Sequence, residues 1–273
     1  GRASAAVVLL LLATGCVGRP AGSETLPLES RSYGFIDALL QGKPGQPVVV
    51  EGSLTLPPAE ATGPPYPALV LLHTSNGQGS QDWLYAKRLS EAGIAVLAID
   101  SFSGRGVRHT VRDQTLVSTA SMLADAFAAL DLLSGDPRID PARIGVMGFS
   151  KGAIAALYAA YQPVQRQAAR QGRSFALHVA YYPWCGLRLY EPLATGAPVL
   201  IQTGELDNLV PPERCAELIA ASSGPSGPPN MKLLILPKAR HAFDHPLLAM
   251  FGQLPISAPS PAFCRLQQQS DGS

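Results

Sequence analysis

Apolar residues in this chain occur in two alternating patterns. Short and nearly continuous apolar runs predict strands, and runs such as 68–73 and 94–99 are typical of strands buried on both faces of a parallel sheet. By this criterion, strands are expected at 48–57, 68–73, 94–99, 143–149, 176–182, 197–203 and 231–236. We expect the first of them at an edge of the sheet.

The segments between these strands carry helical periodicity. Within 115–134, Leu123, Phe127, Leu130 and Leu133 recur at steps of four, three and three, which places them on one helical face. Helices are expected at 82–92, 115–134, 152–161 and 211–221. Strands separated by such helices imply right-handed βαβ crossovers. The predicted fold class is therefore α/β, with a mostly parallel central sheet flanked by helices.

The first 16 residues have the features of an export signal. Arg2 precedes an apolar run at 7–13 that is too short to span a bilayer. Small residues then lead to Cys16, a pattern that resembles the lipobox of bacterial lipoproteins, although Ala13 stands where the lipobox usually has Leu. We expect an exported protein of the bacterial cell envelope. It is either lipid-anchored through Cys16 or periplasmic after removal of an ordinary signal peptide.

The remaining chain divides into three segments by composition. Residues 17–30 are polar and predict a tether, 31–252 carry the α/β pattern, and 253–273 are rich in Pro, Ser and Gln and predict an irregular tail. A length of 273 residues suits one α/β domain.

Charge and cysteine content narrow the class of protein. The 21 Lys and Arg residues and 20 Asp and Glu residues leave a net charge of +1 without a basic stripe, so nucleic acid is not an expected partner.

Cys185, Cys215 and Cys264 show no CxxC spacing. Cys185 follows one strand and Cys215 lies in the helix after the next, so we expect a disulfide between them and a free or disordered Cys264.

Residues 148–152 read Gly-Phe-Ser-Lys-Gly and lie between a predicted strand and a predicted helix. This is the setting of a nucleophile elbow, in which glycines leave room for a strained turn that exposes the serine hydroxyl. Ser150 is therefore the candidate nucleophile. The alternative is a glycine-rich turn with an idle serine.

A serine nucleophile needs a base, and the chain has five histidines. His241 lies five residues past the last predicted strand and is the preferred base, with His245 as its rival. Of the other three, His73 is expected to shape a loop, His109 to lie in a polar loop and His178 to lie within a strand.

The base in turn needs a carboxylate. Asp207 follows the strand at 197–203, and Glu205 is its alternative. Asp244 is too close in sequence to His241 to reach round its ring, so replacing it is expected to have a mild effect. The order Ser150, Asp207, His241 is the order of α/β-hydrolases.

Backbone amides are expected to form an oxyanion hole. One is the amide of Lys151, and the other comes from Thr74 or Ser75, which follow a strand end. Arg105 is a candidate for binding a substrate carboxylate, or it pins its own loop. Trp184 is a candidate for the pocket wall, or it belongs to the core.

Four motifs together resemble the dienelactone hydrolase family of α/β-hydrolases. They are 100–106 (Asp-Ser-Phe-Ser-Gly-Arg-Gly), 148–152, 204–207 (Gly-Glu-Leu-Asp) and 239–244 (Ala-Arg-His-Ala-Phe-Asp). The resemblance covers roughly residues 35–250. It implies hydrolysis of an ester or lactone without a metal or organic cofactor. The enzyme that names the family uses a cysteine nucleophile, so Ser150 indicates a serine branch and argues against dienelactone as the substrate.

The expected function is that of an exported serine hydrolase that cleaves small carboxylic esters or lactones. A peptidase or an acyltransferase on the same fold is one alternative. A non-catalytic cell-envelope binding protein is another, because fold alone does not establish activity. No segment marks an extended lid, so short acyl chains are expected.

Overall fold

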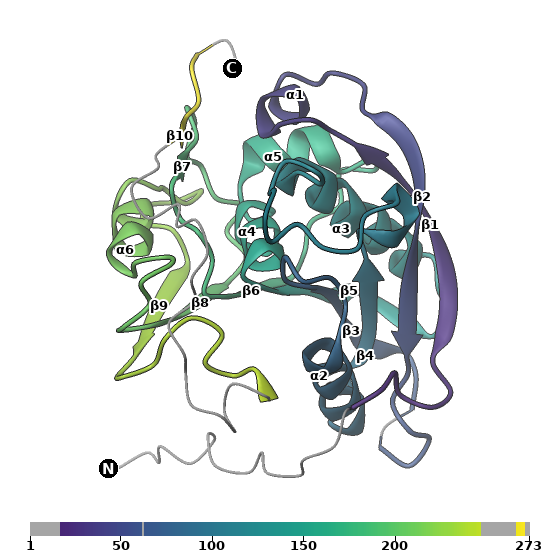
Figure 1. Ribbon diagram of the computed structural model, residues 1–273. Helices are drawn as coiled ribbons and strands as arrows, with labels where there is room; N and C mark the ends of the chain where they lie inside the picture. Colours follow the sequence, from purple (N-terminus) through teal and green to yellow (C-terminus); the bar gives the residue numbers. More distant parts are fainter. Residues whose placement is uncertain (1–16, 62, 247–265, 271–273) are drawn as a thin grey trace.

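The computed structural model describes residues 17–61, 63–246 and 266–270, and this part of the chain is built around an eight-stranded sheet (Figure 1). The strands lie in the order β1-β2-β4-β3-β5-β6-β8-β9. Their bounds are β1 Glu24–Ser32, β2 Gln46–Thr55, β3 Tyr66–Leu72, β4 Ala95–Asp100, β5 Ile139–Phe149, β6 Leu177–Tyr181, β8 Val199–Gly204 and β9 Met231–Leu236. The pairs β1–β2 and β2–β4 are antiparallel, and all other pairs are parallel. The sheet is therefore mostly parallel, as predicted.

Helices cover both faces of the sheet. Figure 1 shows α3 and α4 on one face and α2 on the other. The helix bounds are α1 Ile36–Leu40, α2 Ser80–Glu91, α3 Thr119–Ser134, α4 Lys151–Tyr158, α5 Gln162–Ala168 and α6 Glu213–Ala220, with a 3-10 turn η1 at Ser103–Arg105. The N-terminus of α3 is capped by Ser118, whose hydroxyl accepts the amide of Ser121.

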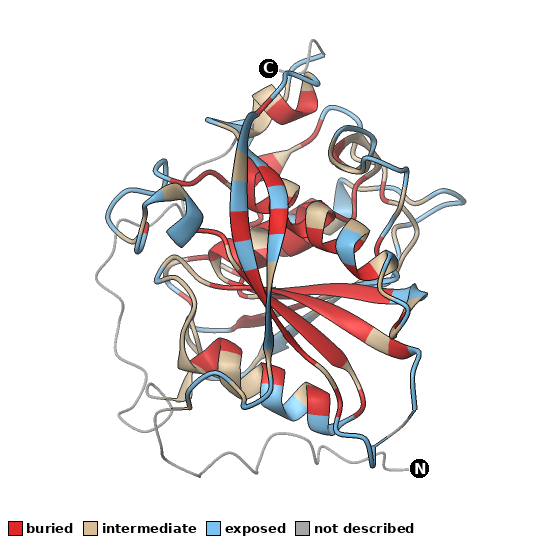
Figure 2. Ribbon diagram, turned by 90° about the vertical axis from the view of Figure 1, so that its right-hand side faces the viewer, coloured by how far each residue is buried: buried red, intermediate tan, exposed pale blue. Residues whose placement is uncertain are grey.

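The central strands are buried on both faces, as Figure 2 shows. Val70 in β3, Leu97 in β4 and Val146 in β5 have no exposed surface. One core lies between the sheet and α3 and α4, and a second lies between the sheet and α2. This rigid support fixes the carboxyl ends of the parallel strands, where ligands bind in such sheets.

The predicted strands and helices are confirmed to within a few residues, but the predicted tether is wrong. Residues 24–32 form β1, which pairs along its whole length with β2. Leu28 and Ser30 face the interior while their neighbours are exposed. The segment is polar because one face of this edge strand is exposed to solvent. The sheet begins at residue 24 instead of residue 31, and β2 is not an edge strand.

The predicted irregular tail is also corrected where the structure describes it. Leu266–Gln267 forms β10, which pairs in parallel with β7, Leu187–Arg188. The amide of Gln268 donates to the carbonyl of Arg188 at 2.8 Å. Residues 247–265 and 271–273 lie outside the described residues.

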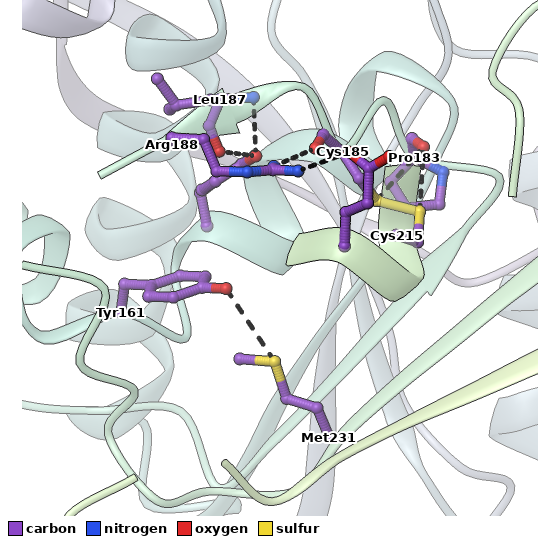
Figure 3. Close-up of a disulfide and its surroundings, with 9 residues drawn as sticks. Tyr161, Pro183, Cys185, Leu187, Arg188, Cys215 and Met231 are labelled. Atoms are coloured by element: carbon purple, nitrogen blue, oxygen red, sulfur yellow. Dashed lines mark hydrogen bonds and ion pairs between the residues drawn. A yellow bond between two sulfur atoms is a disulfide. The ribbon is translucent and has the colours of Figure 1, made fainter. Parts of the chain in front are cut away.

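The predicted disulfide joins Cys185 and Cys215, with 5.0 Å between their Cα atoms (Figure 3). It links the loop after β6 to α6. The guanidinium of Arg188 donates to the carbonyl of Cys185 at 2.7 Å, which ties β7 to the same loop. Cys16 and Cys264 lie outside the described residues. Within the described part of the chain, every helix is too short or too polar to cross a membrane.

Candidate active site

Ser150 lies in a strained turn between β5 and α4. Its backbone has φ 50° and ψ −110°, a conformation that residues with a side chain rarely adopt. The amide of Ser150 donates to the carbonyl of Tyr181 at 2.9 Å, which fixes the turn to the end of β6. This is the geometry of a nucleophile elbow.

The two glycines of this turn leave no room for a side chain. A Cβ atom at Gly148 would lie 2.3 Å from the carbonyl carbon and oxygen of Gly152. A Cβ atom at Gly152 would lie 2.3 Å from the carbonyl oxygen of Leu72. The amide of Gly152 also donates to the carbonyl of His73 at 3.1 Å, so the turn packs directly on the end of β3.

The structure brings Ser150, Asp207 and His241 together from three loops. His241 Nε2 lies 3.0 Å from Ser150 Oγ, and His241 Nδ1 lies 2.8 Å from Asp207 Oδ2. Because an ionised carboxylate only accepts, Nδ1 carries the proton and donates to Asp207, which leaves Nε2 free to accept the Ser150 proton. Both His241 and Asp207 are buried.

Asp207 is itself held by the backbone. Its Oδ1 accepts the amides of Leu209 at 3.0 Å and Val210 at 2.9 Å, and its Oδ2 faces His241. The alternative carboxylate, Glu205, accepts the amide of Lys238 at 2.8 Å instead. The geometry therefore favours Asp207 over Glu205 as the partner of the histidine.

Asp244 belongs to a second buried cluster, behind the histidine. Its Oδ1 accepts the hydroxyl of Tyr182 at 2.8 Å, and its Oδ2 accepts the hydroxyl of Tyr85 at 2.8 Å and the amide of Gln81 at 2.9 Å. Burial raises the pKa of Asp244, and these three hydrogen bonds oppose the rise. This cluster was not predicted from the sequence, where its one signal was an acid within three residues of the expected base.

The other histidines occupy the places expected of them or line the cavity. His73 Nδ1 donates to the carbonyl of Thr74 at 2.7 Å, and His73 Nε2 accepts the amide of Ser101 at 3.2 Å. His178 is buried in β6, where desolvation lowers its pKa to about 4. His245 lines the cavity, and its buried Nδ1 makes no hydrogen bond within the described residues.

Lys151 is the first residue of α4, so its amide has no acceptor within the helix. The side chain of Lys151 is buried and not solvated. Its Nζ donates to the backbone carbonyl of Gln114 at 2.8 Å and to Gln114 Oε1 at 3.0 Å. Desolvation lowers the pKa of Lys151 to about 8. Thr74 and Ser75 both line the cavity beside it, so either amide remains a candidate for the oxyanion hole.

The structure does not support the expectation that Arg105 binds a substrate carboxylate. It supports the alternative, in which Arg105 holds its own loop in place. Its guanidinium donates to both carboxylate oxygens of Asp125, at 2.8 and 2.9 Å, and to Ser32 Oγ at 2.9 Å. The ion pair is buried, and Ser30 also donates to Asp125. Arg105 therefore holds η1 and β1 against α3, and its donors are already used.

A cavity of about 1220 Å³ opens at Ser150 and His241. Trp184 lies in its wall and also packs against both cores, and the loop at 111–115 lines another side. No group of three or more His, Cys, Asp or Glu side chains in the described part of the chain stands in a position to hold a metal ion.

Fold and site together place the chain among the α/β-hydrolases. It belongs to the dienelactone hydrolase family, whose model matches residues 52–252. An uncharacterised protein of Mycobacterium tuberculosis is 31% identical over 173 residues, which cover 58% of this chain and 59% of that protein. The chain thus spans about three fifths of the length of this curated relative.

Solved structures share the fold at low sequence identity. Thermogutta terrifontis esterase 2 phosphoramylated by tabun has a TM-score of 0.59 and 17% identity, over 86% of this chain and 97% of that chain. The same esterase with butyrate bound has a TM-score of 0.54 and 19% identity, over 71% of this chain and 80% of that chain.

Proposed function

We propose that this protein is a serine hydrolase of carboxylic esters or lactones. The observation that carries the proposal is the continuous hydrogen-bonded chain from Ser150 Oγ through His241 to Asp207, at 3.0 and 2.8 Å. A strained serine, an oriented imidazole and a backbone-held carboxylate are the parts that acyl transfer needs.

The mechanism follows from the direction of these hydrogen bonds. His241 Nε2 takes the proton of Ser150 as Oγ bonds to the acyl carbon. The carbonyl oxygen becomes an oxyanion, which the amides of Lys151 and of Thr74 or Ser75 stabilise. The bond to the alcohol oxygen then breaks, and His241 gives its proton to that oxygen. A water molecule repeats the sequence on the acyl-enzyme, which releases the acid and restores the Ser150 hydroxyl.

Relatives and family membership support the reaction class. The family model covers 201 residues between positions 52 and 252, including all three loops of the site. Thermogutta terrifontis esterase 2, which shares the fold, has been solved with butyrate bound and in a form phosphoramylated by tabun. An organophosphorus reagent is therefore a suitable probe for Ser150.

The test is covalent labelling of the folded protein with a fluorophosphonate, read by peptide mass spectrometry. We expect one label on Ser150 and none in Ser150→Ala or in heat-unfolded protein. Absence of the label on correctly folded protein would leave the non-catalytic binding protein as the better reading.

Peptidase and acyltransferase activities are separated from esterase activity by substrate. We expect hydrolysis of aryl esters to exceed that of matched aryl amides by orders of magnitude, with free acid as the main product when an alcohol is added. A dominant transfer product would identify an acyltransferase, and comparable amide hydrolysis would identify a peptidase.

We also propose that the protein is exported to the cell envelope, with Cys16 as the lipid attachment site. The apolar segment before Cys16 and the disulfide between Cys185 and Cys215 support this location, since disulfides persist in oxidising compartments. Fractionation of bacteria expressing the full chain and Cys16→Ala tests it. A mature N-terminus at an unmodified residue other than Cys16 would exclude the anchor.

A further inference from the structure

We propose that the part of the cavity that runs along α4, here called the α4 arm, is a subsite for an extended apolar acyl chain. The enzyme would then prefer esters of medium-chain acids over acetyl or butyryl esters. This inference rests on the proposed function, and it replaces the expectation of short acyl chains.

One face of α4 carries the arm away from the nucleophile. Ser150, Ile154 and Tyr158 all line the cavity, and their spacing of four residues places them on the same helical face. At 1.5 Å per residue, the eight residues from Ser150 to Tyr158 span about 12 Å. The lining of the cavity therefore follows this face of α4 from Ser150 past Ile154 toward Tyr158, which has no exposed surface and closes the arm.

At the far end of the arm, the one polar group of Tyr158 is already used within the protein. Tyr158 is fully buried, and its hydroxyl donates to the carbonyl of Leu187 at 2.8 Å while accepting the amide of Leu187 at 3.1 Å. Because both backbone groups of Leu187 use this hydroxyl, Tyr158 adds no unused hydrogen-bond donor to the end of the arm.

The opposite walls of the arm come from elements that the sequence did not predict. Ile36 and Leu40 of α1 line one side, and Leu187 of β7 and Leu266 of β10 line another. Polar residues also line the cavity, and they include the exposed segment 112–115, Asp37 of α1, Ser118 and Thr119 at the start of α3, and Gln267 of β10. The accessible surface of the cavity is nonetheless mostly apolar, which is typical of a site that takes an apolar ligand from water.

The position of His241 decides which part of the ester enters the arm. His241 must give its proton to the leaving alcohol, so the alcohol lies on the side of His241, Leu209 and Ala242. The acyl group extends from the same carbon in the other direction, toward Ile154 and Tyr158. We therefore assign the arm to the acid and not to the alcohol.

The size of the cavity fits this assignment. Its volume of about 1220 Å³ exceeds the roughly 300–1,000 Å³ of ordinary small-molecule pockets. An acetyl group would leave the α4 arm empty, whereas each methylene group that enters it gains from leaving water. The expected gain is about fourfold in kcat/KM per methylene group, the factor that corresponds to ~0.8 kcal/mol.

The first experiment measures kcat/KM for 4-nitrophenyl acetate, butyrate, octanoate and dodecanoate. We expect a rise of at least tenfold from acetate to octanoate, and little further gain once the chain outgrows the arm. Acetate esters of butanol and octanol form the second series, and we expect them to differ by less than threefold. A flat acyl series, or a preference that follows the alcohol instead, would overturn the assignment.

Two substitutions place the preference in the arm. Ile154→Trp fills it, and Leu266→Glu puts a charge on a residue that is 52% exposed, where the fold tolerates it. Each should lower the ratio of octanoate to acetate kcat/KM at least tenfold. Leu132→Glu, on an exposed position of α3 away from the cavity, is the matched control and should leave the ratio unchanged.

A binding measurement separates this inference from the proposed function. Ser150→Ala cannot form the acyl-enzyme, so calorimetry with octanoate and butyrate reports on the arm alone. We expect octanoate to bind at least tenfold more tightly than butyrate. Tighter octanoate binding without esterase activity in the wild type would refute the proposed function and leave the subsite standing. Esterase activity with equal binding of both acids would refute the subsite.

Discussion

The rings of Tyr182 and His241 pack in a T-shaped arrangement with 4.7 Å between their centroids. Tyr182 has φ 45°, and its hydroxyl donates to Asp244, three residues after His241. One aromatic side chain thus contacts the candidate base directly and holds the loop that carries it. Gln81 and Tyr85 of α2 bind the same carboxylate, so α2 also supports the position of His241.

Alanine substitutions in the proposed catalytic triad of Ser150, His241 and Asp207 should act as a unit. Ser150→Ala and His241→Ala should each lower kcat/KM on an aryl ester by at least about 10⁴-fold, and the double variant should lose little more. Steady-state kinetics on the three variants, with circular dichroism to check folding, measures this. Losses that multiply in the double variant would show that the two residues act independently.

Asp207→Asn should be severe because an amide reverses the hydrogen bond that holds the tautomer of His241. We expect a loss of about 10³–10⁴-fold in kcat. Glu205→Gln is the matched control on the same loop, and it should cost less than about threefold. If the two results are exchanged, Glu205 is the acid.

Asp244→Asn should lower stability and activity more than the mild effect expected from its closeness to His241 in the sequence. Both carboxylate oxygens accept hydrogen bonds, so an amide in either orientation turns its NH₂ group toward a donor. We expect a loss of about 1–3 kcal/mol in the free energy of unfolding and about tenfold in kcat. Tyr182→Phe keeps the ring against His241 and should lower kcat less than Asp244→Asn does. Urea unfolding and kinetics on both variants test this, and a silent Asp244→Asn would contradict it.

Lys151 should make the stability of the protein rise with pH in a defined window. Burial holds its pKa at about 8 in the folded protein, below the 10.5 of a solvated lysine. Between these values the unfolded chain binds more protons than the folded one, so the free energy of unfolding rises as pH increases, by up to about 1.4 kcal/mol per pH unit. Unfolding in urea from pH 7.5 to 9.5 should show the rise for the wild type relative to Lys151→Met. A difference that stays constant with pH would mean that the ammonium is not desolvated.

The disulfide should contribute about 3–4 kcal/mol to the free energy of unfolding, since it closes a loop of 30 residues. The double variant Cys185→Ser, Cys215→Ser should unfold at lower urea concentration than the wild type. Dithiothreitol should destabilise the wild type and leave the double variant unchanged. Equal midpoints for the two proteins would show that the bridge does not constrain the unfolded chain.

The sequence was sufficient for the elements whose apolar contrast is strong. Central strands such as β3 and β5 are buried on both faces, so they appear as apolar runs, and the residues that follow them lie at one edge of the sheet. This is why Ser150, Asp207 and His241 were found from sequence and lie within hydrogen-bonding distance in the structure.

Elements with one exposed face were not predictable in the same way. β1 alternates exposed residues with Leu28 and Ser30, so its composition resembled that of a linker. The partner of Arg105 was missed because Asp125 lies on α3, 20 residues away in the chain. An acid among the buried alanines of a helix was the available signal, because a buried carboxylate needs a cation.

The backbone hydrogen bond from Gly152 to His73 has a consequence for how the enzyme would respond to thermal motion. This bond joins the turn that carries Ser150 to the strand end that leads to Thr74. Both of its atoms belong to the backbone, so the link does not depend on the conformation of a side chain. If the amide of Thr74 is an oxyanion donor, as proposed, this bond preorganises its position relative to Ser150. Little reorganisation energy is then required as charge develops on the substrate.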